Sequence, residues 1–252
     1  MKLAITGKGG VGKTTIAALL AKEFDARGLK VYAIDADPDA NLATTLGIPD
    51  GDRIKPIVEL KALIKERVGA TSEEIGTYFT MNPRVDDIPD EYGVRIGNIR
   101  LLVMGHIPKA RGGCACPENI LVRELVSHAL TQQDEVVILD MEAGIEHLGR
   151  GTAQGVDVMV IVVEPSRQSI ETAQRIQKLA ADLGVPKIVG IANKIASEDE
   201  LRLVKEALKT LDIVAHLPLD LEIRAKSLGS EPISATQIID ATLKQLTNQL
   251  LA

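Results

Sequence analysis

The 252-residue sequence is poor in cysteine and in aromatic residues, and it contains no tryptophan. Two cysteines cannot build the disulfide framework of a small secreted protein, so we expect a chain that works in a reducing cytoplasm. Aromatic residues make up 2% of the sequence, too few for the stacking surfaces that bind single-stranded nucleic acid. Acidic residues outnumber basic ones by 35 to 29, and the net charge of −6 disfavours broad nucleic-acid binding.

Long apolar runs are also missing. The longest run, residues 158–163, has the length of a strand, whereas a membrane span needs about 20 residues. We expect no signal peptide in residues 1–6, because Gly7 and Lys8 interrupt the apolar stretch. We therefore expect no contact with a membrane.

Short apolar segments alternate with helical patterns along the chain. Several segments are apolar at every position, as in parallel strands that helices cover on both faces. This alternation predicts one α/β domain over residues 1–252, with a doubly wound, mostly parallel sheet and helices on both faces. Residues 71–97 follow no clear period, and we expect a surface insertion there, or alternatively a partner-docking loop. The predicted strands are residues 2–6, 31–35, 99–104, 135–140, 157–163, 187–193 and 213–217, and the predicted helices are 14–27, 56–68, 117–132, 166–183, 198–211 and 235–250.

A phosphate-binding loop follows the first predicted strand. Residues 7–14 read GKGGVGKT, which matches the G-x-x-x-x-G-K-[ST] pattern between a strand and a helix. Glycines let successive backbone N–H groups face an anion, and the start of the next helix adds positive charge. Lys13 is expected to bind the β- and γ-phosphates of ATP, and the Thr14 hydroxyl to ligate Mg²⁺. The predicted ATP- or ADP-binding residues of the loop are Gly9, Gly10, Val11, Gly12, Lys13, Thr14 and Thr15.

The two cysteines, Cys114 and Cys116, stand two residues apart. Such close thiols form strained disulfides, but as thiolates they can share one metal ion. Two sulfurs provide half of the ligands of a four-coordinate metal ion, so a two-fold dimer would complete the site with the cysteine pair of the second chain. We expect an intersubunit site for nickel, zinc or cuprous copper, with a redox-sensing thiol pair or simple packing cysteines as the alternatives.

The second lysine of the loop, Lys8, makes the chain resemble ATPases with a deviant Walker A motif, which include the nitrogenase iron protein, MinD, ParA and the arsenical-pump ATPase. The resemblance implies that Lys8 reaches the nucleotide of a second subunit and acts there like an arginine finger. It also implies that the adenine base contacts Asn193, Pro218, Leu219 and Asp220.

The same resemblance assigns roles to residues after two further strands. Asp37 would orient the attacking water, and Asp140, which ends the apolar run 136–139, would hold Mg²⁺ through water. Gly144 would sense the γ-phosphate. In that segment this chain carries glutamates where many relatives are rich in proline, at Glu142 and Glu146.

The Cys-x-Cys pair narrows the resemblance to the CooC-type accessory proteins of carbon monoxide dehydrogenase. It implies a homodimeric, Mg²⁺-dependent ATPase that binds Ni²⁺ at Cys114 and Cys116, where Zn²⁺ could also bind, and that supplies the nickel of the Ni-Fe-S cluster in the dehydrogenase catalytic subunit. One alternative is a MinD/ParA-like positioning ATPase, although Lys244 is the single cation of residues 234–252. The other is an iron–sulfur electron donor or scaffold ATPase, although residues 141–151 contain no cysteine and no C-x-x-C lies near the C-terminus.

Overall fold

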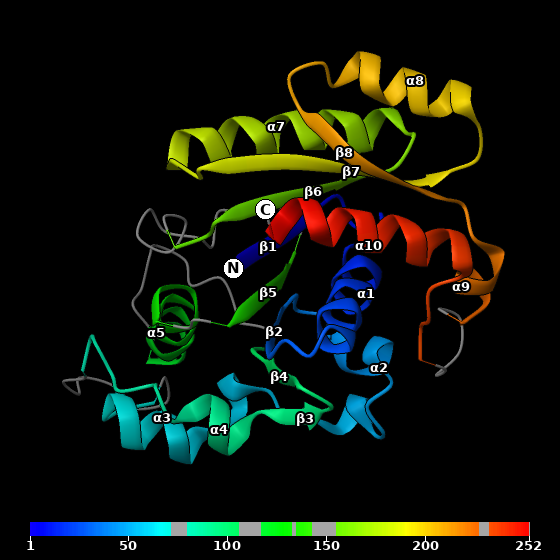
Figure 1. Ribbon diagram of the computed structural model, residues 1–252. Helices are drawn as coiled ribbons and strands as arrows, with labels where there is room; N and C mark the ends of the chain where they lie inside the picture. The colour runs from blue at the N-terminus through cyan, green and yellow to red at the C-terminus, as the bar shows by residue number, and fades with distance from the viewer. Residues whose placement is uncertain (72–79, 106–116, 133–134, 143–154, 227–231, 252) are drawn as a thin grey trace.

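Eight strands form one sheet in the computed structural model, which describes residues 1–71, 80–105, 117–132, 135–142, 155–226 and 232–251 (Figure 1). The strand order is β3-β4-β2-β5-β1-β6-β7-β8, and every neighbouring pair is parallel except β3 and β4. This sheet confirms the predicted fold class. The strands are β1 Lys2–Gly7, β2 Val31–Ala36, β3 Val94–Ile96, β4 Ile99–Val103, β5 Val136–Met141, β6 Val158–Val163, β7 Lys187–Ile195 and β8 Asp212–Pro218.

Helices cover both faces of the sheet. Buried apolar side chains of α1, α2 and α10 pack on one face, and those of α3, α5, α7 and α8 pack on the other (Figure 1). No helix in the described part of the chain is long and apolar enough to cross a membrane. The helices are α1 Lys13–Ala26, α2 Leu42–Leu46, α3 Lys61–Val68, α4 Ile88–Tyr92, α5 Pro117–Gln132, α7 Arg167–Leu183, α8 Glu198–Ala207, α9 Leu221–Lys226 and α10 Gln237–Leu251.

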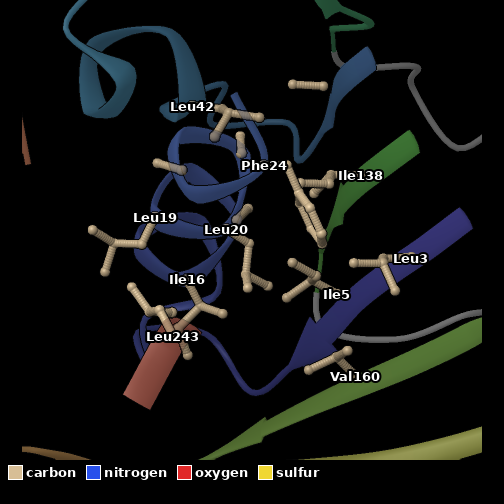
Figure 2. Close-up of a cluster of buried hydrophobic side chains, with 14 of the residues drawn as sticks. Leu3, Ile5, Ile16, Leu19, Leu20, Phe24, Leu42, Ile138, Val160 and Leu243 are labelled. Carbon is tan, nitrogen blue, oxygen red and sulfur yellow. The ribbon is translucent and has the colours of Figure 1, made fainter. Parts of the chain in front are cut away.

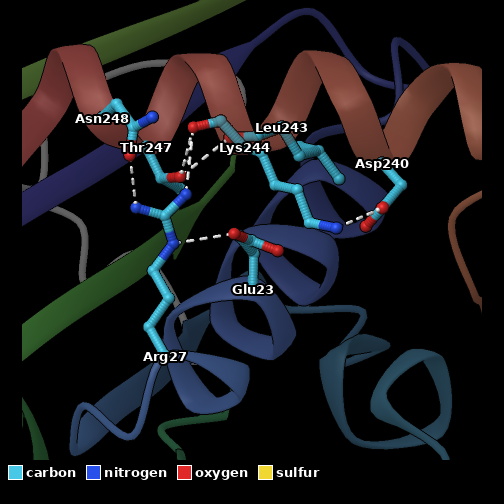
Figure 3. A network of polar contacts seen from close by, with 7 residues as sticks. All are labelled: Glu23, Arg27, Asp240, Leu243, Lys244, Thr247 and Asn248. Carbon is cyan, nitrogen blue, oxygen red and sulfur yellow. Dashed lines mark hydrogen bonds and ion pairs between the residues drawn. The ribbon is translucent and has the colours of Figure 1, made fainter.

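Helix α1, which follows the phosphate loop, is held along its whole length. Ile16, Leu20 and Phe24 are fully buried beside strands β1 and β5 (Figure 2). At its end, Arg27 donates hydrogen bonds to the Asn248 side chain at 2.7 Å and the Lys244 carbonyl at 3.0 Å, both on α10 (Figure 3). Because α1 is fixed between the sheet and α10, the loop at its start has a rigid support.

The structure differs from the prediction mainly in short elements. Helices α2, α4 and α9 and strand β3 have three to six residues, too few to show a helical or strand period in the sequence. Residues 71–97 were expected to form a surface insertion, but their described part contributes Val85 and Ile88, 5% and 0% exposed, to the core. The predicted helix 56–68 is interrupted at Leu60, which separates a 3₁₀ turn, Ile57–Glu59, from α3.

Candidate functional site

The candidate site lies at the carboxyl ends of the parallel strands, where open α/β sheets bind ligands. A cavity of about 840 Å³ opens there between the phosphate loop, the loop after β2 and the ends of β7 and β8. The structure therefore brings most of the predicted nucleotide-binding residues together. Those that line the cavity are Gly9, Gly10, Gly12, Lys13, Thr14, Thr15, Asp37, Asn193, Pro218, Leu219 and Asp220.

The phosphate loop turns sharply between β1 and α1. The Val11 N–H donates to the Lys8 carbonyl at 3.4 Å, and Gly10 has a φ of 82°, which a residue with a side chain rarely adopts. Gly12 has a φ of 98°, and a Cβ atom there would lie 2.5 Å from the Asn193 amide nitrogen. Both glycines are thus required by geometry, one for the turn and one for the close approach of β7.

Lys13 and Asp37 join the phosphate loop to the loop after β2. The Lys13 ammonium lies 3.8 Å from Asp37 Oδ2, and the two side chains are 6% and 17% exposed. Asp37 Oδ1 accepts a hydrogen bond from the Asp39 N–H at 3.1 Å. Asp37 is therefore the counter-ion of Lys13, and an entering phosphate would compete with this carboxylate for the ammonium.

Two buried carboxylates lie on neighbouring strands, close to Lys13 and Asp37. Asp35 on β2 and Asp140 on β5 are register partners, and both side chains are 0% exposed. Burial, reinforced by the Asp35 charge, raises the pKa of Asp140 to about 7. The Thr14 hydroxyl and the Lys13 ammonium oppose this shift, but neither Asp140 oxygen accepts a hydrogen bond of good geometry from the described residues. A buried carboxylate without a donor is a strong candidate for contact with a cation.

Asp35 has a different environment from Asp140. Its two oxygens accept hydrogen bonds from the Asp37 N–H at 3.2 Å and from the Leu42 N–H at 2.9 Å. Burial raises the pKa of Asp35 to about 6, against the effect of these two donors. Asp35 therefore shapes the loop that presents Asp37, a role that sequence analysis missed. Its position, at the end of an apolar strand, was the available signal.

The residues predicted to form the base pocket line the cavity, but their polar side chains already have hydrogen-bond partners. The Asn193 amide nitrogen donates to the Val11 carbonyl at 2.8 Å. Asp220 caps α9, because its carboxylate accepts from the Glu222 and Ile223 N–H groups and from the Thr236 hydroxyl. The adenine contacts of these residues stay predictions.

Three predicted site residues, Cys114, Cys116 and Gly144, lie outside the described residues. Among the residues that the structure describes, no group of three or more His, Cys, Asp or Glu side chains is arranged to hold a metal ion. Sequence analysis also missed Lys194, whose ammonium reaches the Gly10 carbonyl at 2.5 Å. Its signal was its place directly after Asn193 at the end of an apolar strand.

Comparison with known proteins shows the family to which this chain belongs. The model of the CobQ/CobB/MinD/ParA nucleotide-binding domain matches residues 2–233. Carbon monoxide dehydrogenase accessory protein CooC from Rhodospirillum rubrum is 49% identical over 228 residues, which cover 89% of this chain and 86% of that protein. The chain belongs to the CooC-type accessory ATPases of this family.

Two further comparisons concern the length and the fold of this CooC-type chain. An uncharacterized ATP-binding protein from Methanocaldococcus jannaschii is 43% identical over 254 residues, which cover 100% of this chain and 98% of that protein. The crystal structure of a ParA family ATPase from Chlorobium tepidum superposes with a TM-score of 0.71 at 19% identity, over 98% of this chain and 97% of that one. At that identity the likeness concerns the fold alone.

Proposed function

We propose that this CooC-type ATPase is a homodimer that uses Mg²⁺ and ATP to deliver Ni²⁺ to the catalytic subunit of a carbon monoxide dehydrogenase. The observation that carries the proposal is the Cys114-Ala115-Cys116 sequence in a chain that is 49% identical to a carbon monoxide dehydrogenase accessory protein. Residues 1–252 would act as one domain. Nucleotide binding and hydrolysis would change how the two chains meet, and with it the geometry of the four shared thiolates.

The carboxyl edge of the sheet fits a magnesium-bound nucleotide. Thr14 and Asp140 would hold Mg²⁺, the hydroxyl directly and the carboxylate through water, and the ion would neutralise charge on the phosphate oxygens. The fit rests on Asp140, whose buried oxygens accept no hydrogen bond of good geometry from the described residues. Lys13 would then bind the phosphates.

Asp37 would orient the attacking water once a phosphate has taken its place beside Lys13. Replacing Asp37 with asparagine keeps the size of the side chain and an oxygen for the Asp39 N–H, but it removes the negative charge. We expect kcat for ATP hydrolysis to fall on the order of 10²-fold. With Mg²⁺ and ATP, the variant should accumulate as an ATP-bound dimer, measured by light scattering and by the nucleotide that elutes with it.

The change Asp52→Asn serves as the control, since this exposed side chain lies outside the residues that line the cavity. It should leave turnover and oligomeric state as in the wild type. Normal turnover in Asp37→Asn would remove this carboxylate from the mechanism.

The metal assignment predicts a definite stoichiometry. Titration of the anaerobic protein with Ni²⁺ should give a sulfur-to-nickel charge-transfer band that saturates at one ion per two chains, while scattering reports a dimer. Cys114→Ser should abolish tight nickel binding, because one thiolate per chain cannot complete a four-sulfur site. The same variant should bind ADP with the wild-type affinity, which shows that the phosphate loop is intact.

A histidine variant controls for accidental nickel binding. His216 is exposed on β8, so His216→Ala should leave the charge-transfer band and its stoichiometry unchanged. If Cys114→Ser bound nickel as tightly as the wild type, the proposed thiolate site would be wrong. Saturation at one ion per chain without dimerisation would equally contradict the shared site.

A further inference from the structure

Two consecutive residues of β7 hold the phosphate loop by two consecutive carbonyl groups. Asn193 donates to the Val11 carbonyl at 2.8 Å, and the Lys194 ammonium donates to the Gly10 carbonyl at 2.5 Å. Successive N–H groups can face an anion only while the carbonyls between them point elsewhere. Donors that engage these carbonyls therefore favour the loop conformation that binds phosphate.

The backbone of Lys194 is adapted to this contact. Lys194 has a φ of 59°, in the left-handed region that residues with a side chain rarely adopt. It lies where β7 shifts register against β8, between Ala192 and Ile195. Such bulges re-aim a side chain and are common beside functional sites. A strained backbone that directs the Lys194 side chain toward the phosphate loop indicates that this side chain has a functional role.

Glu164, after β6, keeps the Lys194 ammonium in place. Its Oε2 lies 3.3 Å from the Lys194 Nζ, and the two side chains are 23% and 40% exposed. Glu164 is itself anchored, because its backbone N–H donates to the Ser169 hydroxyl at 3.1 Å at the start of α7. The lysine thus connects the loops after β1, β6 and β7.

We propose that Lys194 is a positioning residue for nucleotide binding: it keeps the Gly10 carbonyl turned away from the phosphates, with Glu164 as its anchor. It acts through the backbone of the loop, and it takes no part in the chemical step. The proposal rests on nucleotide binding by the phosphate loop and is independent of nickel. The nickel stoichiometry of any Lys194 variant should equal that of the wild type, so the two proposals fail separately.

The substitution Lys194→Gly separates positioning from folding, because it removes the ammonium and also relieves the backbone strain. We expect Kd for ADP with Mg²⁺, measured by calorimetry, to rise about tenfold, since a charged donor to the loop is lost. The thermal midpoint of the nucleotide-free protein should stay unchanged or rise. KM for ATP should rise with Kd, while kcat at saturating ATP stays within about twofold.

Two further variants complete the test. Lys194→Arg retains a long cation and should recover most of the ADP affinity. Lys187→Ala, at the exposed start of the same strand, should bind ADP like the wild type. The proposal is overturned if Lys194→Gly binds ADP within about twofold of the wild type. It is also overturned if the affinity falls together with the thermal midpoint, or if arginine fails to restore it.

Discussion

Replacing Lys8 with alanine should lower kcat for ATP hydrolysis on the order of 10³-fold and leave Kd for ADP nearly unchanged. Lys8 begins the turn at the tip of the phosphate loop, beside the exposed Gly9 and Gly10. Within the described part of its own chain, the Lys8 ammonium has no hydrogen bond or ion pair. A cation that the described residues of its own chain do not hold is available to a second subunit, where it would stabilise charge that develops on the phosphoryl oxygens. Such an interaction lowers the barrier without adding to ADP binding.

Mixing two inactive variants tests whether Lys8 acts between chains. Lys13→Ala removes the lysine that binds phosphate in its own chain, but it keeps Lys8. In a mixed dimer, the Lys8→Ala chain has an intact Lys13 and receives Lys8 from its partner, so one complete site forms. Equal amounts of the two variants should therefore recover up to about a quarter of the wild-type rate, because half of the dimers are mixed. A role for Lys8 within its own chain predicts no recovery, and an equal loss of hydrolysis and ADP affinity in Lys8→Ala would also support that role.

The fold could be predicted from the sequence because its signals are local and repeated. Strands covered on both faces, such as β6, are apolar at every position, and the helices after β1, β6 and β7 are long enough to show a period of their own. Short elements carry no such signal. Helix α4 is defined by tertiary contacts, since the fully buried Ile88 belongs to the core that α3 and α5 also bury.

The site could be predicted only as far as a motif or a resemblance specified it. Glycines and Lys13 in residues 7–14 identify the phosphate loop, because few other sequences curl around an anion. Lys194 acts through the Gly10 carbonyl of the phosphate loop, which is distant from it in the sequence. Asp35 acts through an N–H group of the loop that follows its own strand. The Lys194 contact depends on strand order and register, and the Asp35 contacts depend on the conformation of the loop after β2; neither composition nor spacing reveals these features.

Replacing Asp140 with asparagine should stabilise the magnesium-free protein at alkaline pH. With its pKa raised to about 7, Asp140 binds a proton more readily in the folded chain than in the unfolded one. The stability that it contributes is therefore fully present below about pH 4 and is lost as the pH rises through about 7. Above that pH the wild type must keep a charge buried beside Asp35, and asparagine removes this cost. We expect the variant to gain at most about 4 kcal/mol at pH 8, or roughly 10 °C in thermal midpoint.

The stability difference between wild type and Asp140→Asn should change sign when Mg²⁺ and ADP are present. With EDTA, the midpoints of wild type and Asp140→Asn should agree near pH 4 and diverge in favour of the variant toward pH 8. Asp35, with its pKa raised to about 6, leaves a smaller pH dependence of the thermal midpoint in both proteins. With Mg²⁺ and ADP at pH 8, the wild type should become the more stable protein, because binding to the folded state adds stability that the variant lacks. Asp212→Asn, an exposed carboxylate at the start of β8, should follow the wild type throughout. A variant that is less stable than the wild type in EDTA at pH 8 would show that the carboxylate supports the empty fold. Asp140 would then be a structural residue, and the assignment of magnesium to this edge of the sheet would lose its basis.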